Sequence, residues 1–80
     1  MRQLTDKDIN ELKATVPVIV GAKICNLRLK KGLTQIELAN RIYSDRQYLY
    51  KIEKGLVGLS VVKLVVIAKA LGVSPSSLLE

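Results

Sequence analysis

Apolar residues recur along this chain three or four positions apart, which is the spacing of helices rather than the alternation of strands. The spacing predicts helices near residues 6–15, 18–31, 35–42, 45–54, 61–71 and 75–79. The residues expected to share one core are Val20, Ile24, Leu27, Leu38, Ala39, Ile42, Leu49, Ile52, Val61, Leu64, Ala68 and Leu71. The pattern therefore predicts an all-α fold, built as a compact bundle of short helices.

Glycine and hydroxyl residues stand at the joints between the predicted helices. Glycine adopts at little cost the left-handed conformation that ends a helix, and a serine or threonine oxygen accepts a free N–H group where a helix begins. The glycines placed to end helices are Gly32, Gly55 and Gly72. The residues placed to begin helices are Thr5, Thr34, Ser44, Ser60 and Ser74. Because Pro17 interrupts the pattern, we expect an N-terminal helical extension over residues 1–17 and the main domain over residues 18–80.

Residues 34–54 predict a helix-turn-helix. A short helix opened by Thr34 ends near Ile42, and Tyr43 and Ser44 alone separate it from the next helix. A turn this tight sets two helices nearly perpendicular, so that one crosses a DNA backbone while the other enters the major groove. Ser44 and Gln47 have the spacing of a capping box at the start of the second helix.

The predicted helix 45–54 has one apolar and one polar face. Leu49 and Ile52 point toward the core. Arginine pairs well with guanine O6 and N7, glutamine pairs well with adenine N6 and N7, and lysine reads guanine or neutralises a phosphate. The candidate base contacts on the opposite face are Arg46, Gln47, Tyr50 and Lys51. A polar face that is merely solvated is the alternative interpretation.

Phosphate contacts are expected from the same two helices. Gln35 is the first residue of the helix opened by Thr34, where free N–H groups and the helix dipole favour an anion. A role restricted to capping is the alternative for Gln35. The other expected phosphate contacts are Tyr48, Lys54 and Arg41.

Charge and composition narrow the class of partner. The net charge is +6, and the charges of residues 1–17 cancel, so the excess lies in residues 18–80 and favours nucleic acid over a membrane. Histidine is absent, and the chain shows no catalytic constellation, metal cluster or phosphate loop, so we expect no enzyme, metal, cofactor or small-molecule ligand. The single Cys25 and the lack of a signal peptide or a membrane-spanning run favour a cytoplasmic protein.

Three blocks of the chain resemble the Cro/Xre-type (phage-repressor) helix-turn-helix family: TQ-x-ELA from Thr34, IEKG from Ile52 and IAKALGVS from Ile67. The resemblance extends over about residues 19–79, and the residues around Asp45 are also similar to restriction–modification controller proteins. It implies a lambda-repressor-like core of five helices, here with the extra N-terminal helix. It also implies a homodimer on a near-palindromic operator in double-stranded DNA.

The resemblance also assigns roles to individual residues. It implies base contacts from Arg46 and Gln47 and a phosphate contact from Gln35. The family packs together the helices that carry Arg28 and Glu53, so we expect a partly buried ion pair, with two separate surface charges as the alternative. The chain departs from the family at Tyr43, where many members have glycine, because tyrosine resists a positive φ.

The predicted helix 61–71 carries more apolar residues than its core face needs. A contiguous exposed apolar area more often marks an interface, so we expect a symmetric homodimer built from the C-terminal helices. A broad face buried beneath the helix 6–15 is the alternative. The expected interface residues are Val62, Val65, Val66, Leu78 and Leu79.

Two functions fit these features. The first is sequence-specific binding of double-stranded DNA by a transcriptional regulator, a repressor or an autoregulator, that reads the major groove with the helix 45–54. The second is an antitoxin or adaptor whose main partner is another protein. Since only residues 1–17 are left over for such a partner, the sequence favours the regulator.

Overall fold

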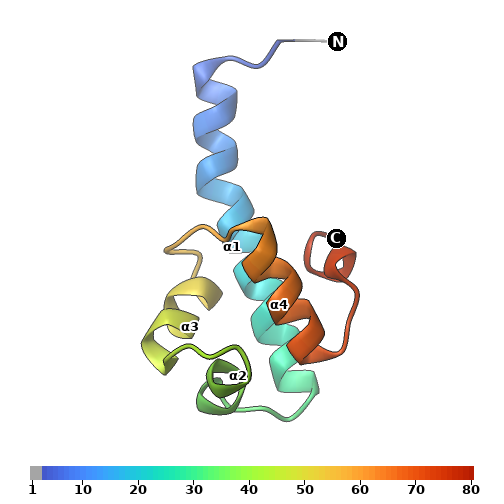
Figure 1. Cartoon of the computed structure of the whole chain (residues 1–80). Helices are drawn as coiled ribbons and strands as arrows, with labels where there is room; N and C mark the ends of the chain where they lie inside the picture. The colour runs from blue at the N-terminus through green and yellow to red at the C-terminus, as the bar shows by residue number, and fades with distance from the viewer. Residues whose placement is uncertain (1–2) are drawn as a thin grey trace.

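The computed structural model describes residues 3–80, which fold into four α-helices and one short 3-10 helix. The elements are α1 (Asp6–Lys30), α2 (Gln35–Arg41), α3 (Arg46–Glu53), α4 (Val61–Leu71) and the 3-10 helix η1 (Pro75–Leu78). In Figure 1, α2, α3, α4 and η1 gather around the second half of α1. The all-α class is confirmed, but the expected count of five helices and an extra N-terminal one is wrong.

Pro17 does not interrupt the first helix, and α1 runs through it for 25 residues. A proline inside a helix removes one backbone hydrogen bond and costs roughly 3 kcal/mol. Two gains on either side of Pro17 keep the flanks helical: Thr5 and Asp8 form a capping box at the start of α1, and Val20 and Ile24 pack in the core. The expected helix end before Pro17 is therefore wrong, and residues 6–17 of the expected extension are the first half of α1. Residues 1 and 2 lie outside the described part of the chain.

The core lies where α1, α2, α3 and α4 meet. Most residues expected there are buried, whereas Leu27 and Leu64 are only half-buried. Val61 was wrongly expected in the core: it is 77% exposed at the first position of α4, and Ile67 is fully buried instead. Because α4 is apolar on nearly all sides, the spacing of its apolar residues could not orient it. The buried apolar residues are Val20, Ile24, Leu33, Leu38, Ala39, Ile42, Leu49, Ile52, Ile67, Ala68, Leu71 and Leu78.

Gly21 lets α3 lie directly against α1. A Cβ atom at this position would collide with the backbone carbonyl groups of Ile52 and Glu53. Only glycine permits so close an approach of two backbones. The close contact brings the end of α3, including the side chain of Glu53, beside the second half of α1.

Candidate nucleic-acid interface

The turn between α2 and α3 takes a left-handed residue at Tyr43. Its φ is 54°, and the Ser44 N–H donates to the Ala39 carbonyl at 2.9 Å, which closes the turn in the manner of a Schellman motif. The tyrosine therefore takes a left-handed conformation that glycine would adopt at little cost. Its side chain is 99% exposed, so packing contributes almost nothing to hold it there.

Asp45, and not Ser44, begins the second helix of this unit. The Asp45 carboxylate accepts from the Tyr48 backbone N–H at 2.7 Å, and α3 starts at Arg46. The expected capping box of Ser44 and Gln47 is wrong by one position, because the backbone of Ser44 is still part of the turn. Aspartate caps a helix as well as serine does, so the correct start was visible in the sequence.

Helix α3 presents one fully buried and one exposed face. Leu49 and Ile52 are 0% and 1% exposed, so they fix the rotation of the helix about its axis. The four candidate base contacts are all exposed: Arg46, Gln47, Tyr50 and Lys51. The structure thus brings these side chains together on the outer surface of α3, whose inner face is held in the core by Leu49 and Ile52.

Two of the candidate phosphate contacts are tied to neighbouring helices. The half-buried Gln35 donates from its amide Nε2 to the Glu53 Oε1 at 3.1 Å. The exposed Arg41 donates from Nη1 to the Ala70 carbonyl at 3.2 Å. Because each of these groups carries further N–H donors, both retain hydrogens for an anion.

Tyr48 and Lys54, the other two candidates, each belong to a contact between a cation and a ring. The Nζ of Lys54 lies 5.8 Å from the centroid of the Tyr50 ring. The Nζ of Lys63 lies 5.5 Å from the centroid of the half-buried Tyr48 ring and 3.5 Å from the Ser44 Oγ. Lys63 was missed by the sequence analysis, because nothing local to α4 indicates that its amine reaches the start of α3.

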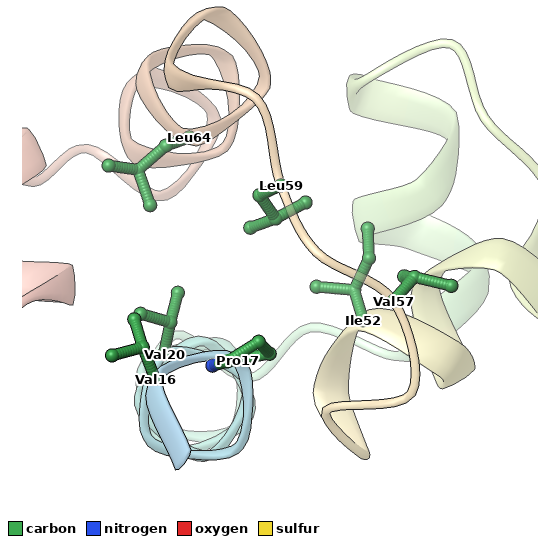
Figure 2. A pocket seen from close by; sticks show the side chains of 7 residues that line it. All are labelled: Val16, Pro17, Val20, Ile52, Val57, Leu59 and Leu64. Carbon is green, nitrogen blue, oxygen red and sulfur yellow. The ribbon is translucent and has the colours of Figure 1, made fainter. Parts of the chain in front are cut away.

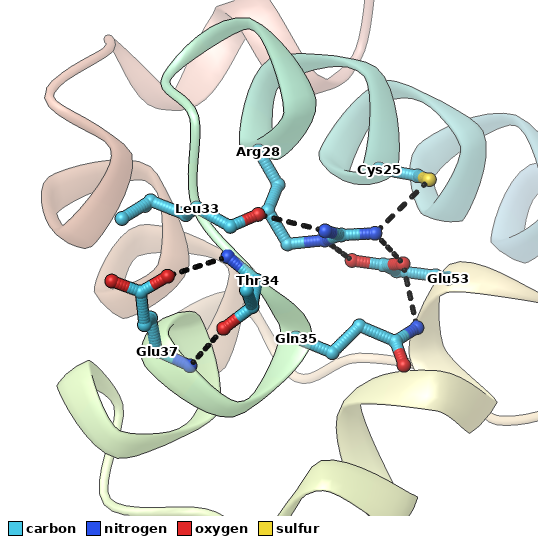
Figure 3. Close-up of polar contacts among 7 residues, drawn as sticks. All are labelled: Cys25, Arg28, Leu33, Thr34, Gln35, Glu37 and Glu53. Atoms are coloured by element: carbon cyan, nitrogen blue, oxygen red, sulfur yellow. Dashed lines mark hydrogen bonds and ion pairs between the residues drawn. The ribbon is translucent and has the colours of Figure 1, made fainter.

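A buried ion pair connects α1 to the helix-turn-helix (Figure 3). The Arg28 Nε and Nη2 donate to the two carboxylate oxygens of Glu53 at 2.7 and 3.1 Å, and Arg28 Nη1 donates to the Leu33 carbonyl at 2.8 Å. Arg28 Nη2 also lies 3.6 Å from the sulfur of the half-buried Cys25. Glu53 in turn accepts from Gln35, so one carboxylate fixes a residue from α1 and a residue from α2.

The protonation of this pair follows from its contacts. Burial by itself raises the pKa of Glu53, but the hydrogen bonds from Arg28 and Gln35 outweigh burial and hold that pKa below its usual value. The hydrogen bond to Glu53 raises the pKa of Arg28 above its usual value. Both groups are therefore charged at neutral pH, as a bidentate pair requires.

An apolar cavity of about 70 Å³ lies between α1, α4 and the loop that joins α3 to α4 (Figure 2). Val57 and Leu59 from that loop line it and pack against the core, so this part of the loop lies on the bundle. The cavity is small beside the roughly 300–1,000 Å³ of a ligand pocket. Its lining residues are Val16, Pro17, Val20, Ile52, Val57, Leu59 and Leu64.

Neither a cluster of metal ligands nor a membrane-spanning helix occurs in residues 3–80. No group of three or more histidine, cysteine, aspartate or glutamate side chains is arranged there to hold a metal ion. No helix in this part of the chain combines the length and the apolar character needed to cross a membrane.

The chain is similar to known proteins in both sequence and structure. A family profile described as Helix-turn-helix matches residues 26–78. An uncharacterized HTH-type transcriptional regulator of Rickettsia conorii is 42% identical over 62 residues, which are 78% of this chain and 50% of that protein. Another from Sinorhizobium fredii is 43% identical over 56 residues, 70% of this chain and 73% of its own length. The chain thus spans about half the length of the first of these relatives.

Among solved structures, this fold is similar to the restriction-modification controller protein C.AhdI of Aeromonas hydrophila. The TM-score is 0.79 and the sequence identity is 34%, with 85% of this chain and 97% of that chain covered. The similarity therefore extends over most of the chain.

Proposed function

Because this chain belongs to the Cro/Xre-type helix-turn-helix family, we propose that it binds one specific operator in double-stranded DNA as a transcriptional repressor or autoregulator. The observation that carries the proposal is α3, whose inner face is fully buried while its outer face carries Arg46, Gln47, Tyr50 and Lys51. A helix anchored in this way presents its polar side chains to the major groove in a fixed register. The resemblance to restriction–modification controllers supports the same placement of α3 in the major groove.

In this proposal the outer face of α3 reads base edges. Arg46 pairs with O6 and N7 of a guanine, and Gln47 with N6 and N7 of an adenine. Both stand in the first turn of α3, which is the end that enters the groove in helix-turn-helix proteins. Tyr50 and Lys51 lie one turn further along and contact the neighbouring bases.

The flanking residues hold the backbone of the duplex. Gln35 keeps one amide hydrogen for a phosphate while Glu53 accepts the other. Arg41, Tyr48 and Lys54 serve the adjacent phosphates, and such contacts set position without reading sequence. Lys63 adds a cation at the start of α3, beside Ser44 and Tyr48.

A homodimer on a near-palindromic operator completes the proposal. Val62, Val66 and Leu79 are 73%, 38% and 60% exposed, and Val65 between them is half-buried. Leu78, expected in this interface, is 0% exposed within the core of its own chain, so we leave it out. A twofold dimer through this face would place two α3 helices on half-sites about 10 base pairs apart, or a multiple of that spacing.

Selection of bound duplexes from a random pool by the purified chain tests the proposal. We expect enrichment of one near-palindromic site, with affinity that falls steeply as salt rises, because binding releases counterions from the phosphates. A pool that yields no enriched sequence, or binding that is indifferent to salt, would contradict operator recognition. A tightly bound small protein that copurifies from the native cell would favour the alternative of an antitoxin or adaptor.

A further inference from the structure

The first half of α1 projects beyond the bundle and is exposed on all sides (Figure 1). From Gln3 to Val16 only Asp8 is half-buried, and the first buried residue of the helix is Val20. An isolated helix of this length is marginally stable in water even with a good cap. A helix that extends this far from its own core is expected to be stabilised by packing against another molecule.

The projecting half of α1, residues 6–16, carries an apolar stripe. Ile9, Leu12 and Val16 follow helical spacing and are 40%, 48% and 42% exposed. Together with Lys13 and Pro17 they line an open groove along one side of the helix. The opposite side carries Lys7, Glu11 and the small Ala14. The segment is therefore amphipathic, and its apolar side remains largely open to solvent within residues 3–80.

This stripe continues onto the bundle. Val16 and Pro17 line both the open groove and the apolar cavity closed by Leu59 and Leu64 (Figure 2). A helix that lay in the groove would therefore also cover the mouth of the cavity with apolar contacts. The apolar surface available to a partner is therefore larger than that of Ile9, Leu12 and Val16 alone.

The charges of the segment favour a second copy of this chain as its occupant. Residues 3–17 carry three carboxylates, Asp6, Asp8 and Glu11, against two amines, Lys7 and Lys13, in a chain of net charge +6. Two copies of such a basic chain repel each other over most of their surface. Residues 3–17 are nearly neutral, so this repulsion is weak between two copies of the segment. A nearly neutral amphipathic helix fits an identical helix better than it fits a strongly acidic or basic partner.

We propose that residues 6–16 form a self-association surface, on which α1 of a second copy packs antiparallel. Ile9 of one copy then lies opposite Val16 of the other, and the two Leu12 side chains meet at the twofold axis, as an isologous contact requires. The antiparallel direction keeps the acidic first turns apart and aligns the helix dipoles favourably, whereas a parallel pair would place Asp6 and Asp8 of both copies side by side. This contact is separate from the proposed α4 interface and needs no DNA.

Sedimentation of the free protein from low-micromolar to several-hundred-micromolar concentration tests the contact. With Val62→Glu and Val66→Glu present to remove the proposed α4 contact, the chain should still associate reversibly. In that background Leu12→Asp should raise the dimer dissociation constant at least about tenfold, because each dimer loses two buried leucines. Ala14→Asp adds the same charge on the opposite side of α1 and should leave association unchanged. Both variants lie outside the core, so their unfolding transitions should match that of the wild type.

Val62→Glu distinguishes this contact from the α4 interface, because it should leave association through α1 in place. A monomer at every concentration would overturn the proposal, as would equal weakening by Leu12→Asp and Ala14→Asp. Association lost with Val62→Glu but kept with Leu12→Asp would overturn it as well. No duplex is present in these measurements, so a failure here is independent of whether the chain recognises an operator.

Cysteine crosslinking tests the antiparallel geometry. In a Cys25→Ser background, Leu12→Cys places two thiols across the proposed axis, where the Cα separation suits a disulfide. Mild oxidation should crosslink this variant rapidly and the Ala14→Cys variant slowly. Equal rates for the two would rule out a contact centred on Leu12.

Discussion

Arg28 and Glu53 meet through two hydrogen bonds, Nε to Oε2 at 2.7 Å and Nη2 to Oε1 at 3.1 Å, although 25 positions separate them in the chain. Both residues are 8% exposed. The pair ties the end of α3 to α1, and through Gln35 it also ties the start of α2. It therefore sets the relative positions of the two helices that carry the candidate DNA contacts.

Glu53→Gln should destabilise the domain, because it leaves the Arg28 guanidinium buried without a counter-charge. Breaking one side of a buried pair costs on the order of 3 kcal/mol. For a domain of this size the melting temperature should fall by more than about 10 °C. Thermal unfolding followed by circular dichroism measures the change. Glu11→Gln, on the exposed half of α1, is the matched control, and equal melting temperatures for the two variants would show that the pair contributes nothing.

The domain should lose stability in acid. Although burial opposes it, hydrogen bonding lowers the folded-state pKa of Glu53, and the cap contacts with the backbone and side chain of Thr34 lower that of Glu37. A depressed carboxyl pKa contributes stability above the unfolded-state pKa, which is near 4.5, and loses it as pH falls through the folded-state value. Denaturant unfolding from pH 7 to pH 3 should show this loss below about pH 4.5. In Glu53→Gln the free energy of unfolding should fall less steeply below that pH. An unchanged pH dependence would contradict the role given to Glu53.

Arg46→Ala and Gln35→Ala should weaken DNA binding in different ways. Loss of Arg46 should cost about 1–3 kcal/mol on the selected site and relax the preference at one base pair. Loss of Gln35 should weaken binding to all sequences more evenly, because a phosphate contact carries no sequence information. Titration of the selected and a scrambled duplex separates the two effects. If Arg46→Ala weakens both duplexes equally, Arg46 contacts only phosphate.

Gln35 also bonds Glu53, so its variant needs a control for folding. The unfolding transition of Gln35→Ala should be recorded beside its affinity. A large loss of stability would assign the weaker binding to a displaced α2 rather than to a missing phosphate contact.

Tyr43→Gly should stabilise the turn. The left-handed conformation costs a residue with a Cβ atom about 1–2 kcal/mol, and glycine removes this cost. Glycine also makes the unfolded chain more flexible, which offsets part of the stabilisation. We expect a net increase of about 0.5–1 kcal/mol in the free energy of unfolding. Denaturant titration measures it. Tyr43→Ala retains the Cβ atom and should gain little, because the tyrosine ring is exposed; an equal gain from alanine would show that the backbone is not strained.

Val62→Glu combined with Val66→Glu should disrupt the proposed α4 interface. Both positions lie on the outer face of α4, so the chain should fold normally, while operator affinity should fall because two half-sites no longer bind as one unit. Gel-shift titration on a full site and on an isolated half-site measures the effect. Affinity retained on the full site would argue against a dimer through α4.

Short-range chemistry in the sequence already determined much of this protein. Thr34, Ser60 and the three helix-ending glycines were correctly predicted, since a helix end depends on groups within about four residues of it. The outer face of α3 was also predictable, because its buried Leu49 and Ile52 alternate with polar residues at helical spacing. The helix ends depend on local hydrogen bonds, and the face of α3 depends on a clear separation of apolar from polar residues around the helix.

Tertiary packing alone decided the rest. Pro17 stays inside α1 because the packing of Val20 and Ile24 and the distant Thr5 cap offset a local cost, and neither gain is visible at the proline. Helix α4 turns Ile67 inward and Val61 outward because an almost wholly apolar helix takes its orientation from its neighbours. Lys63 reaches Ser44 across 19 positions of the chain, and the first half of α1 projects beyond the bundle formed by the rest of residues 3–80. Such relationships depend on where separate helices meet, and the spacing of residues along one helix does not encode that.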